Sequence, residues 1–160
     1  REKAYMGGRK KNNKHEVKAW EHAPNSKSSH FVRLYGSMLN SPAWLALSNG
    51  AKLQYIVIKS QYKGGYQQTD GNGNAMVKCP YTSMNAAGIK SSESISENCR
   101  QLEAFGFVDI KGGGYHIASE YKFSNRWCDI TEKDAQEIKF RLRTDKKDRD
   151  RKAKEKSNRE

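Results

Sequence analysis

Short hydroxyl side chains and two cations gather in one stretch near the middle of the chain. The residues are Lys90, Ser91, Ser92, Ser94, Ser96 and Arg100. A serine is small enough to let another backbone approach, and its hydroxyl can bond a phosphate or a base edge. A guanidinium can donate two bonds to guanine, and a lysine beside the serines is suited to a phosphate. These residue types in this spacing indicate contacts with a nucleic acid.

A second group of candidate contacts surrounds a tract of three glycines over residues 112–114. The group consists of Lys111, His116, Lys122 and Arg126. A flexible glycine loop flanked by cations can lie against a minor groove or along a row of phosphates. We expect this group to supply part of the binding affinity for nucleic acid. For His116, an exposed imidazole without a contact is the simpler interpretation.

Two glutamates, Glu93 and Glu97, lie among the candidate serines. A carboxylate that faces a phosphate backbone is repelled by it. Three alternatives remain open for these side chains: they accept a hydrogen bond from cytosine, they are solvated, or they pair with Arg100 or Gln101 farther along the same helix.

A helix over residues 92–105 must hold the first group. Ile95, Cys99 and Leu102 recur at helical spacing and predict its buried face. A turn at Gly88, an N-cap from the serines at positions 91 and 92, and a stop at Gly106 bound it. With that face buried, the outward positions are Glu93, Glu97, Arg100, Gln101 and Ala104.

The residues before this helix predict its scaffold. Residues 31–35 form a short strand or an extended lead-in, and Ser41 caps a helix that begins at Pro42. Ser48 caps a second helix, although residues 53–58 also tolerate a strand. Residues 75–79 predict a strand, and Pro80 begins a further helix with Met84 and Ala87 inward. The second helix has a buried stripe of Leu47, Ala51, Tyr55, Ile58 and Tyr62, widened by Leu53, Ile56 and Val57.

Beyond Gly106 the pattern favours β-structure. Residues 107–110 and 120–123 predict two strands joined by the glycine loop, after which Trp127 and Ile130 fold back on the core. Thr131 and Asp134 have the spacing of a capped helix start. A weak apolar stripe, Ala135, Ile138 and Leu142, predicts about three helical turns followed by a solvated tail.

Charge divides the chain into three parts. Residues 1–29 carry eight basic residues against three acidic ones and predict a disordered basic arm, which either solubilises the protein or contacts phosphates. Residues 30–130 contain almost all the bulky apolar residues and predict one α+β domain, and residues 131–160 predict a charged, partly helical tail. The net charge of +12 favours a polyanionic partner, and we expect the arm and tail to supply much of the salt-dependent affinity.

The sequence lacks the residue patterns that several classes of function require. The three cysteines are far apart and form no metal-binding spacing with histidine, so we expect reduced thiols and no metal or cofactor. We find no nucleophile triad, acidic nuclease motif or histidine triad and expect no enzymatic activity. No apolar run is long enough for a membrane span or an export signal, so we expect a soluble, cytoplasmic protein without a membrane partner.

The predicted order of helices, strands and wing resembles a winged helix-turn-helix domain. The segments SPAWLALSNGAKLQY, DGNGNAMVKCPYTSM and CRQLEAFGFV are similar to those of plasmid and mobile-element replication initiators and of conjugative-transfer accessory proteins from Gram-positive bacteria. The resemblance covers residues 31–127. It implies binding of double-stranded DNA at an origin or transfer site, with a relaxase or replication proteins as further partners.

Two other functions stay open beside that one. The same fold serves transcriptional regulators that bind an operator as dimers, and the weak stripe after Thr131 is the only candidate dimerisation surface. An RNA-binding protein ranks lower, because the aromatic motif of a base-stacking sheet is missing. The oligomeric state is left open.

Overall fold

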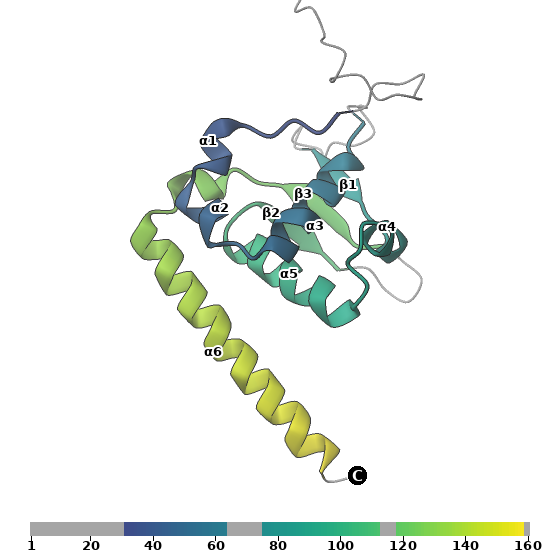
Figure 1. Ribbon diagram of the computed structural model, residues 1–160, viewed down its shortest axis with the longest axis vertical. Coiled ribbons are helices and arrows are strands. Elements are labelled where there is room, and N and C mark those ends of the chain that lie inside the picture. Colours follow the sequence, from purple (N-terminus) through teal and green to yellow (C-terminus); the bar gives the residue numbers. More distant parts are fainter. Residues whose placement is uncertain (1–30, 64–74, 113–117, 159–160) are drawn as a thin grey trace, which may run out of the picture. The chain divides into compact units, whose positions relative to one another are not determined.

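The computed structural model describes residues 31–63, 75–112 and 118–158. Within these ranges the chain forms six α-helices, one 3-10 helix and a three-stranded antiparallel sheet, so the architecture is α+β (Figure 1). The predicted arm over residues 1–29 lies outside the described residues, as do residues 64–74 and residues 113–117, which include most of the predicted glycine loop and the candidate contact His116.

Three helices open the described part: α1 (Gly36–Leu39), α2 (Pro42–Ala46) and α3 (Asn49–Ser60). The Ser41 hydroxyl accepts a hydrogen bond from the backbone N–H of Trp44, and the Ser48 hydroxyl accepts one from Ala51, both at 3.2 Å. These bonds satisfy N–H groups that have no partner within the helix, which confirms both predicted helix starts. Residues 31–35 form no strand, and α1 was not predicted.

The next two helices, α4 (Tyr81–Ala86) and α5 (Ser92–Ala104), are joined by a short turn. Gly88 has a φ of +92°, a left-handed conformation that glycine adopts without steric cost. The Ser91 hydroxyl then accepts from the backbone N–H of Ser94 at 3.3 Å and caps α5. The predicted turn, cap and helix are therefore confirmed, with α5 ending one residue earlier than predicted.

The sheet consists of β1 (Met76–Lys78), β2 (Val108–Lys111) and β3 (Glu120–Phe123), in the order β1-β3-β2. All three strands were predicted within one residue of these positions. Tyr121 of the central strand pairs with Val77 on one side and Ile110 on the other. Because alternate residues of a strand face opposite sides, this row packs on the helices, and the charged rows beside it face outward.

Aromatic rings join α2, α3 and the sheet. The Phe107 ring lies 5.7 Å from Trp44 and 5.4 Å from Tyr55 between centroids, in edge-on contacts. The predicted α3 stripe is buried except for the half-buried Tyr62, but Leu53 is exposed. The side chain beside it, Gln54, is buried in its place, so the predicted widening of the stripe was wrong at this position.

Gly106 turns the chain from α5 into β2 and lets a later segment pass close by. Its φ is +71°, and a Cβ atom here would stand 2.7 Å from the Cβ of Arg126. Arg126 begins the 3-10 helix η3 (Arg126–Asp129), and the next residue, Trp127, stacks on Phe107 with a centroid distance of 5.9 Å. The predicted return of Trp127 and Ile130 to the core is confirmed.

The last helix, α6 (Glu132–Ser157), has 26 residues. The Thr131 hydroxyl accepts from the Asp134 N–H at 3.3 Å, and the Asp134 carboxylate accepts from the Thr131 N–H at 3.0 Å, which is the predicted capping box. Ala135 is buried, and two half-buried side chains of the same stripe, Ile138 and Leu142, pack on the core.

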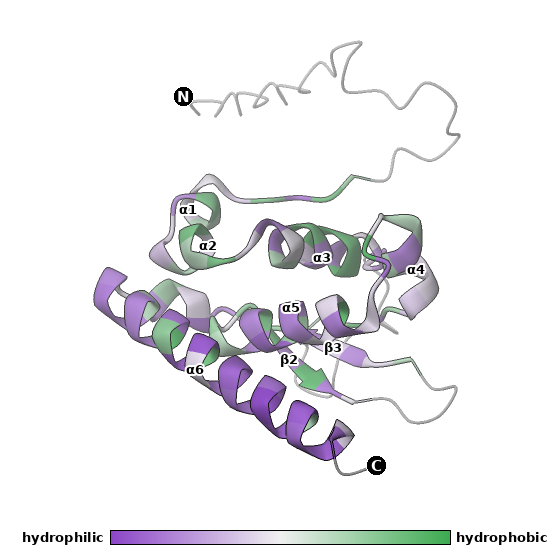
Figure 2. Cartoon of the chain, turned by 60° about the horizontal axis from the view of Figure 1, so that its bottom comes forward, coloured by the Kyte–Doolittle hydropathy of each residue, from purple (hydrophilic) through white to green (hydrophobic). Residues whose placement is uncertain are grey.

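The second half of α6 corrects the predicted tail. The helix continues far beyond the three turns predicted, although its side chains after Leu142 are predominantly hydrophilic (Figure 2). In residues 144–158 only Arg149 is half-buried, and the others are exposed. The predicted exposure was therefore right and the predicted loss of structure was wrong.

Candidate nucleic-acid interface

A buried polar pair fixes α5 on α3. The Asn98 side-chain amide donates to the Gln54 side-chain oxygen at 3.0 Å, and the Gln54 amide donates to the Ile95 carbonyl at 3.2 Å. Asn98 also fills the space above Gly50, where an added Cβ would lie 3.0 Å from its side-chain oxygen. The buried face of α5 thus includes Asn98, whereas the predicted Cys99 is only half-buried.

The structure brings most of the first candidate group to one end and one side of α5. Lys90, Ser92 and Ser94 are exposed around the helix N-terminus, and Ser96 is half-buried one turn later. Ser91 is exposed, with its hydroxyl occupied in capping the helix. Arg100 is exposed and donates to the Glu97 carboxylate at 3.3 Å. Short hydroxyls and a cation therefore share an accessible region, as the sequence predicted.

The sequence predicted an outward-facing Glu97, but its side chain does not face open solvent. Its carboxylate accepts from Arg149 of α6 at 2.8 Å as well as from Arg100, and its side chain is only 19% exposed. The predicted alternative of a pair with Arg100 is confirmed, whereas Arg149 was not foreseen because it lies 52 residues away. The two guanidiniums neutralise the charge that would otherwise repel a phosphate row.

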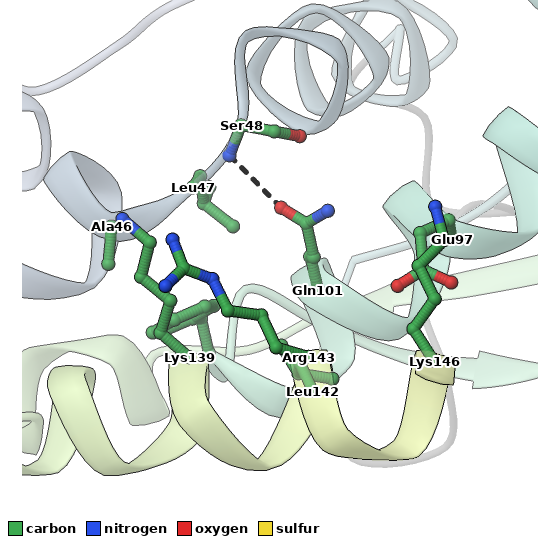
Figure 3. Close-up of a pocket in the computed structure, with 10 residues that line it drawn as sticks. Ala46, Leu47, Ser48, Glu97, Gln101, Lys139, Leu142, Arg143 and Lys146 are labelled. Atoms are coloured by element: carbon green, nitrogen blue, oxygen red, sulfur yellow. Dashed lines mark hydrogen bonds between the residues drawn. The ribbon is translucent and has the colours of Figure 1, made fainter. Parts of the chain in front are cut away.

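Gln101, also predicted to face outward, is turned toward α3. Its side-chain oxygen accepts from the backbone N–H of Ser48 at 3.0 Å, directly at the cap of α3 (Figure 3). This bond satisfies one more N–H at the helix start. Gln101 is therefore a structural link between α5 and α3. Glu93 and Arg100 are the predicted outward positions that are exposed.

The second half of α6 passes the same side of α5. Between the two helices lies a groove of about 320 Å³. Its lining includes Ser92, Ser96 and Arg100 from α5, opposite Arg149 and Ala153 from α6. The helix that carries the candidate serines is thus flanked along its outward side by another helix.

The second candidate group is split by the strand register. Lys111 pairs with Glu120 next to residues 112–119, where the glycine loop was predicted, whereas Val108 pairs with Phe123 at the other end of the strands. Arg126 follows Phe123 and so lies at the end away from the loop, where the prediction did not place it. Its guanidinium binds Asp109 and the hydroxyl of Ser124.

Cations and carboxylates alternate on the outer face of the sheet. Lys78 lies 3.3 Å and Lys111 lies 4.0 Å from the Glu120 carboxylate, on neighbouring strands. Lys122 is half-buried in the central strand, with Asp109 beside it in the register. The face carries a surplus of positive charge, and its exposed ion pairs are weak enough to exchange for phosphate contacts.

A third cationic surface was missed by the sequence interpretation. Lys139, Arg143 and Lys146 of α6 line a cleft of about 360 Å³ against the loop between α2 and α3 (Figure 3). All three are exposed, and no ion pair ties them within the described ranges. Their spacing of four and three residues places them on one side of the helix, roughly 6 Å and 4.5 Å apart along its axis. That spacing is present in the sequence, but it was not interpreted as one side of a helix because the helix was expected to end after about three turns.

The described residues offer little for other chemistry. All three cysteines are free, and burial raises the pKa of the Cys79 thiol to about 11 and raises that of Cys99 too. Low-pKa thiolates are the reactive ones, so these two thiols are suited to packing. Among these residues no cluster of three or more potential ligands could hold a metal ion, and no helix has both the length and the apolarity to span a membrane. No protein-family model, curated protein or solved structure matches the chain.

Proposed function

We propose that this chain binds double-stranded DNA through a winged helix formed by α3, β1, α4, α5, β2 and β3. The observation that carries the proposal is the order of these elements together with the strand order β1-β3-β2. In such an arrangement the second helix of the turn is the one that enters a major groove, and the hairpin after it is the wing. The net charge of +12 supports a polyanionic partner.

Three surfaces supply the contacts in this proposal. Lys90, Ser92 and Ser94 at the start of α5 approach base edges and phosphates, and Arg100 is the candidate for a guanine. Lys111 and Lys122 on the outer face of the sheet contact the neighbouring backbone. Lys139 and Arg143 in the first half of α6 add phosphate contacts, which set the salt dependence without selecting a sequence.

The setting we propose is a mobile genetic element, at an origin of replication or a transfer site in the cytoplasm. The support is the resemblance of the helix and wing segments to replication initiators and conjugative accessory proteins. A relaxase or replication proteins are the further partners in this setting. A dimeric operator-binding regulator is less well supported, because Ala135, Ile138 and Leu142, the stripe predicted as its dimerisation surface, pack on their own domain.

Footprinting of the full chain on the origin and transfer regions of its element tests this function. We expect one or a few protected sites, and an affinity that falls by a factor of about 10³ or more between 50 and 200 mM salt if at least six phosphates are neutralised. Structured RNA should compete less well than duplex DNA. Absence of any protected site from a folded protein, or stronger competition by RNA, would contradict the proposal.

A further inference from the structure

The second half of α6 lies along the outward side of α5 and shields Glu97, whose side chain is only 19% exposed. Arg149 reaches the Glu97 carboxylate at 2.8 Å, and the groove between the helices is lined by Ser92, Ser96 and Arg100. Three candidate contact residues therefore lie beside α6, where Ser96 is half-buried and Ser92 and Arg100 remain exposed. This arrangement has a geometric consequence for the proposed function.

A major groove does not admit both helices. It is about 12 Å wide in B-DNA, and an α-helix with its side chains has a diameter of about 10–12 Å. Helices that pack together lie about 8–10 Å apart, so α5 and α6 side by side present a width of about 20 Å. Insertion of α5 therefore requires that the second half of α6 leave its side.

The two halves of α6 are held with different strength. The first half is anchored by the capping box and by the apolar stripe from Ala135 to Leu142. Residues 144–158 bury no apolar side chain, and the pair between Arg149 and Glu97 is their one ion pair to another element within the described part of the chain. A helical end without apolar packing of its own can open locally at low free-energy cost, so this half can unwind from its free end while the first half stays docked.

We propose that residues 144–157 are a reversible cover that closes the DNA-reading side of α5, with the pair between Glu97 and Arg149 as its latch. This inference rests on the proposed function. DNA and the closed cover exclude each other, so binding shifts the cover toward its open form, and release of the latch favours DNA. Arg100 remains beside Glu97 when Arg149 leaves, at 3.3 Å in the closed form, and continues to offset its charge.

Two charge-reversal variants distinguish the proposed cover from a general attraction between α6 and the DNA phosphates. Arg149→Glu and Arg151→Glu change the net charge equally and lie on the same helix, but Arg151 pairs only within α6, with Asp148 at 3.3 Å. Simple attraction to phosphates predicts the same loss of affinity for both variants. The cover predicts that Arg149→Glu binds about two- to fivefold more tightly than Arg151→Glu, the range expected for loss of one exposed ion pair.

A second matched pair tests the other side of the latch. Glu97→Gln and Glu93→Gln each remove one carboxylate from the outward side of α5, and only Glu97 holds Arg149. With Arg100→Ala in both variants, so that release of Arg100 from Glu97 adds nothing, we expect Glu97→Gln to tighten duplex binding by about two- to fivefold more than Glu93→Gln. Equal gains from the two variants would mean that only repulsion had been relieved, and they would overturn the latch.

Hydrogen exchange of the full chain gives a readout that does not depend on affinity. We expect amides of residues 144–157 to exchange faster when duplex DNA is added, and faster in Arg149→Glu than in Arg151→Glu without DNA. Slower exchange on binding would make this half a DNA contact and would overturn the cover. If neither the wild type nor any variant binds duplex DNA, the proposed function is wrong, and the proposal that residues 144–157 compete with DNA is wrong with it.

Discussion

Asn98 and Gln54 satisfy each other inside an otherwise apolar contact between α3 and α5. Both side chains are buried, at 6% and 0% exposure, and no buried side-chain polar atom of the described residues lacks a partner. A polar pair of this kind is costly to break, because removal of one member leaves the other buried and unsatisfied.

We therefore expect Asn98→Ala to lower the free energy of unfolding by about 1–3 kcal/mol. Chemical denaturation followed by circular dichroism measures this loss. Glu93→Ala is the control, since it shortens an exposed side chain of the same helix. A loss below about 0.5 kcal/mol, the size of an ordinary surface substitution, would contradict the assigned role of Asn98.

Arg100 and the lysines of the sheet make unequal contributions to the proposed DNA contact. Arg100 is already engaged by Glu97, whereas Lys111 is 85% exposed with its Glu120 partner at 4.0 Å. We expect the double variant Lys111→Ala/Lys122→Ala to weaken duplex binding more than Arg100→Ala. It should also reduce the salt slope by about one for each phosphate that is no longer neutralised. A greater weakening by Arg100→Ala in a salt-titrated binding assay would reverse this order.

Residue types and pairs within one helix could be predicted from the sequence, but partners on other elements could not. The serines and cations around α5 are visible as a local cluster, and so is the pair between Glu97 and Arg100. Asn98 was missed because its burial depends on Gln54 of another helix, while Cys99 looked more apolar. Arg149 and Lys139 were missed because their positions depend on where α6 docks, which no local pattern specifies.

At the scale of elements, the helix starts and turns that were predicted correctly depend on capping residues and glycines. Ser41, Ser48, Ser91 and Gly106 each have a local function that does not depend on the rest of the fold, and the strands alternate as half-buried strands do. The length of α6 was missed because residues 144–157 have no apolar period. Their lysines, arginines and Ala153 nevertheless favour helix by intrinsic propensity.

The capping box makes the start of α6 sensitive to acid. Hydrogen bonds from the Thr131 hydroxyl and backbone N–H lower the pKa of Asp134 below its ordinary value of 3.8. Because the folded pKa is lowered, this contribution to stability is complete above the unfolded pKa and is lost as the pH falls through the folded pKa. We expect helicity to decline below pH 3.8 in a step that Asp134→Asn lacks.

Far-ultraviolet circular dichroism from about pH 6 down to about pH 2 follows that step, a range that spans the ordinary pKa of an aspartate. Asp145→Asn is the control within the same helix, because Asp145 lies past the anchored first half of α6 and takes no part in the cap. An acid transition of the same size in Asp134→Asn and in the wild type would show that the cap does not set the stability of this helix at low pH.

At the scale of the molecule, positive charge is concentrated outside the sheet and the short helices. The arm over residues 1–29 has eight basic residues against three acidic ones, and residues 131–160 have twelve against eight. Under the proposed function, long-range attraction to a polyanion would therefore be spread along the chain, while the polar side chains proposed to select a sequence lie on α5.

Deletion of residues 1–29 should accordingly weaken binding to any duplex, specific or not. We expect the slope of log affinity against log salt to become shallower by about 0.9 for each phosphate that the arm neutralises. The ratio of specific to non-specific affinity should stay within about twofold, because arm contacts with phosphates carry no sequence information. A collapse of that ratio in fluorescence anisotropy titrations would assign the arm a role in reading bases.

The contact between Glu97 and Arg149 joins residues 52 positions apart in the sequence, and this separation orders events during synthesis. The ribosome completes α5, the sheet and the anchored start of α6 before it adds Arg149. Domains fold as units from the N-terminal side while the chain grows. A nascent chain that has emerged from the ribosome only as far as the first half of α6 would therefore present the outward side of α5 without Arg149 beside it, and the finished molecule would form this contact last.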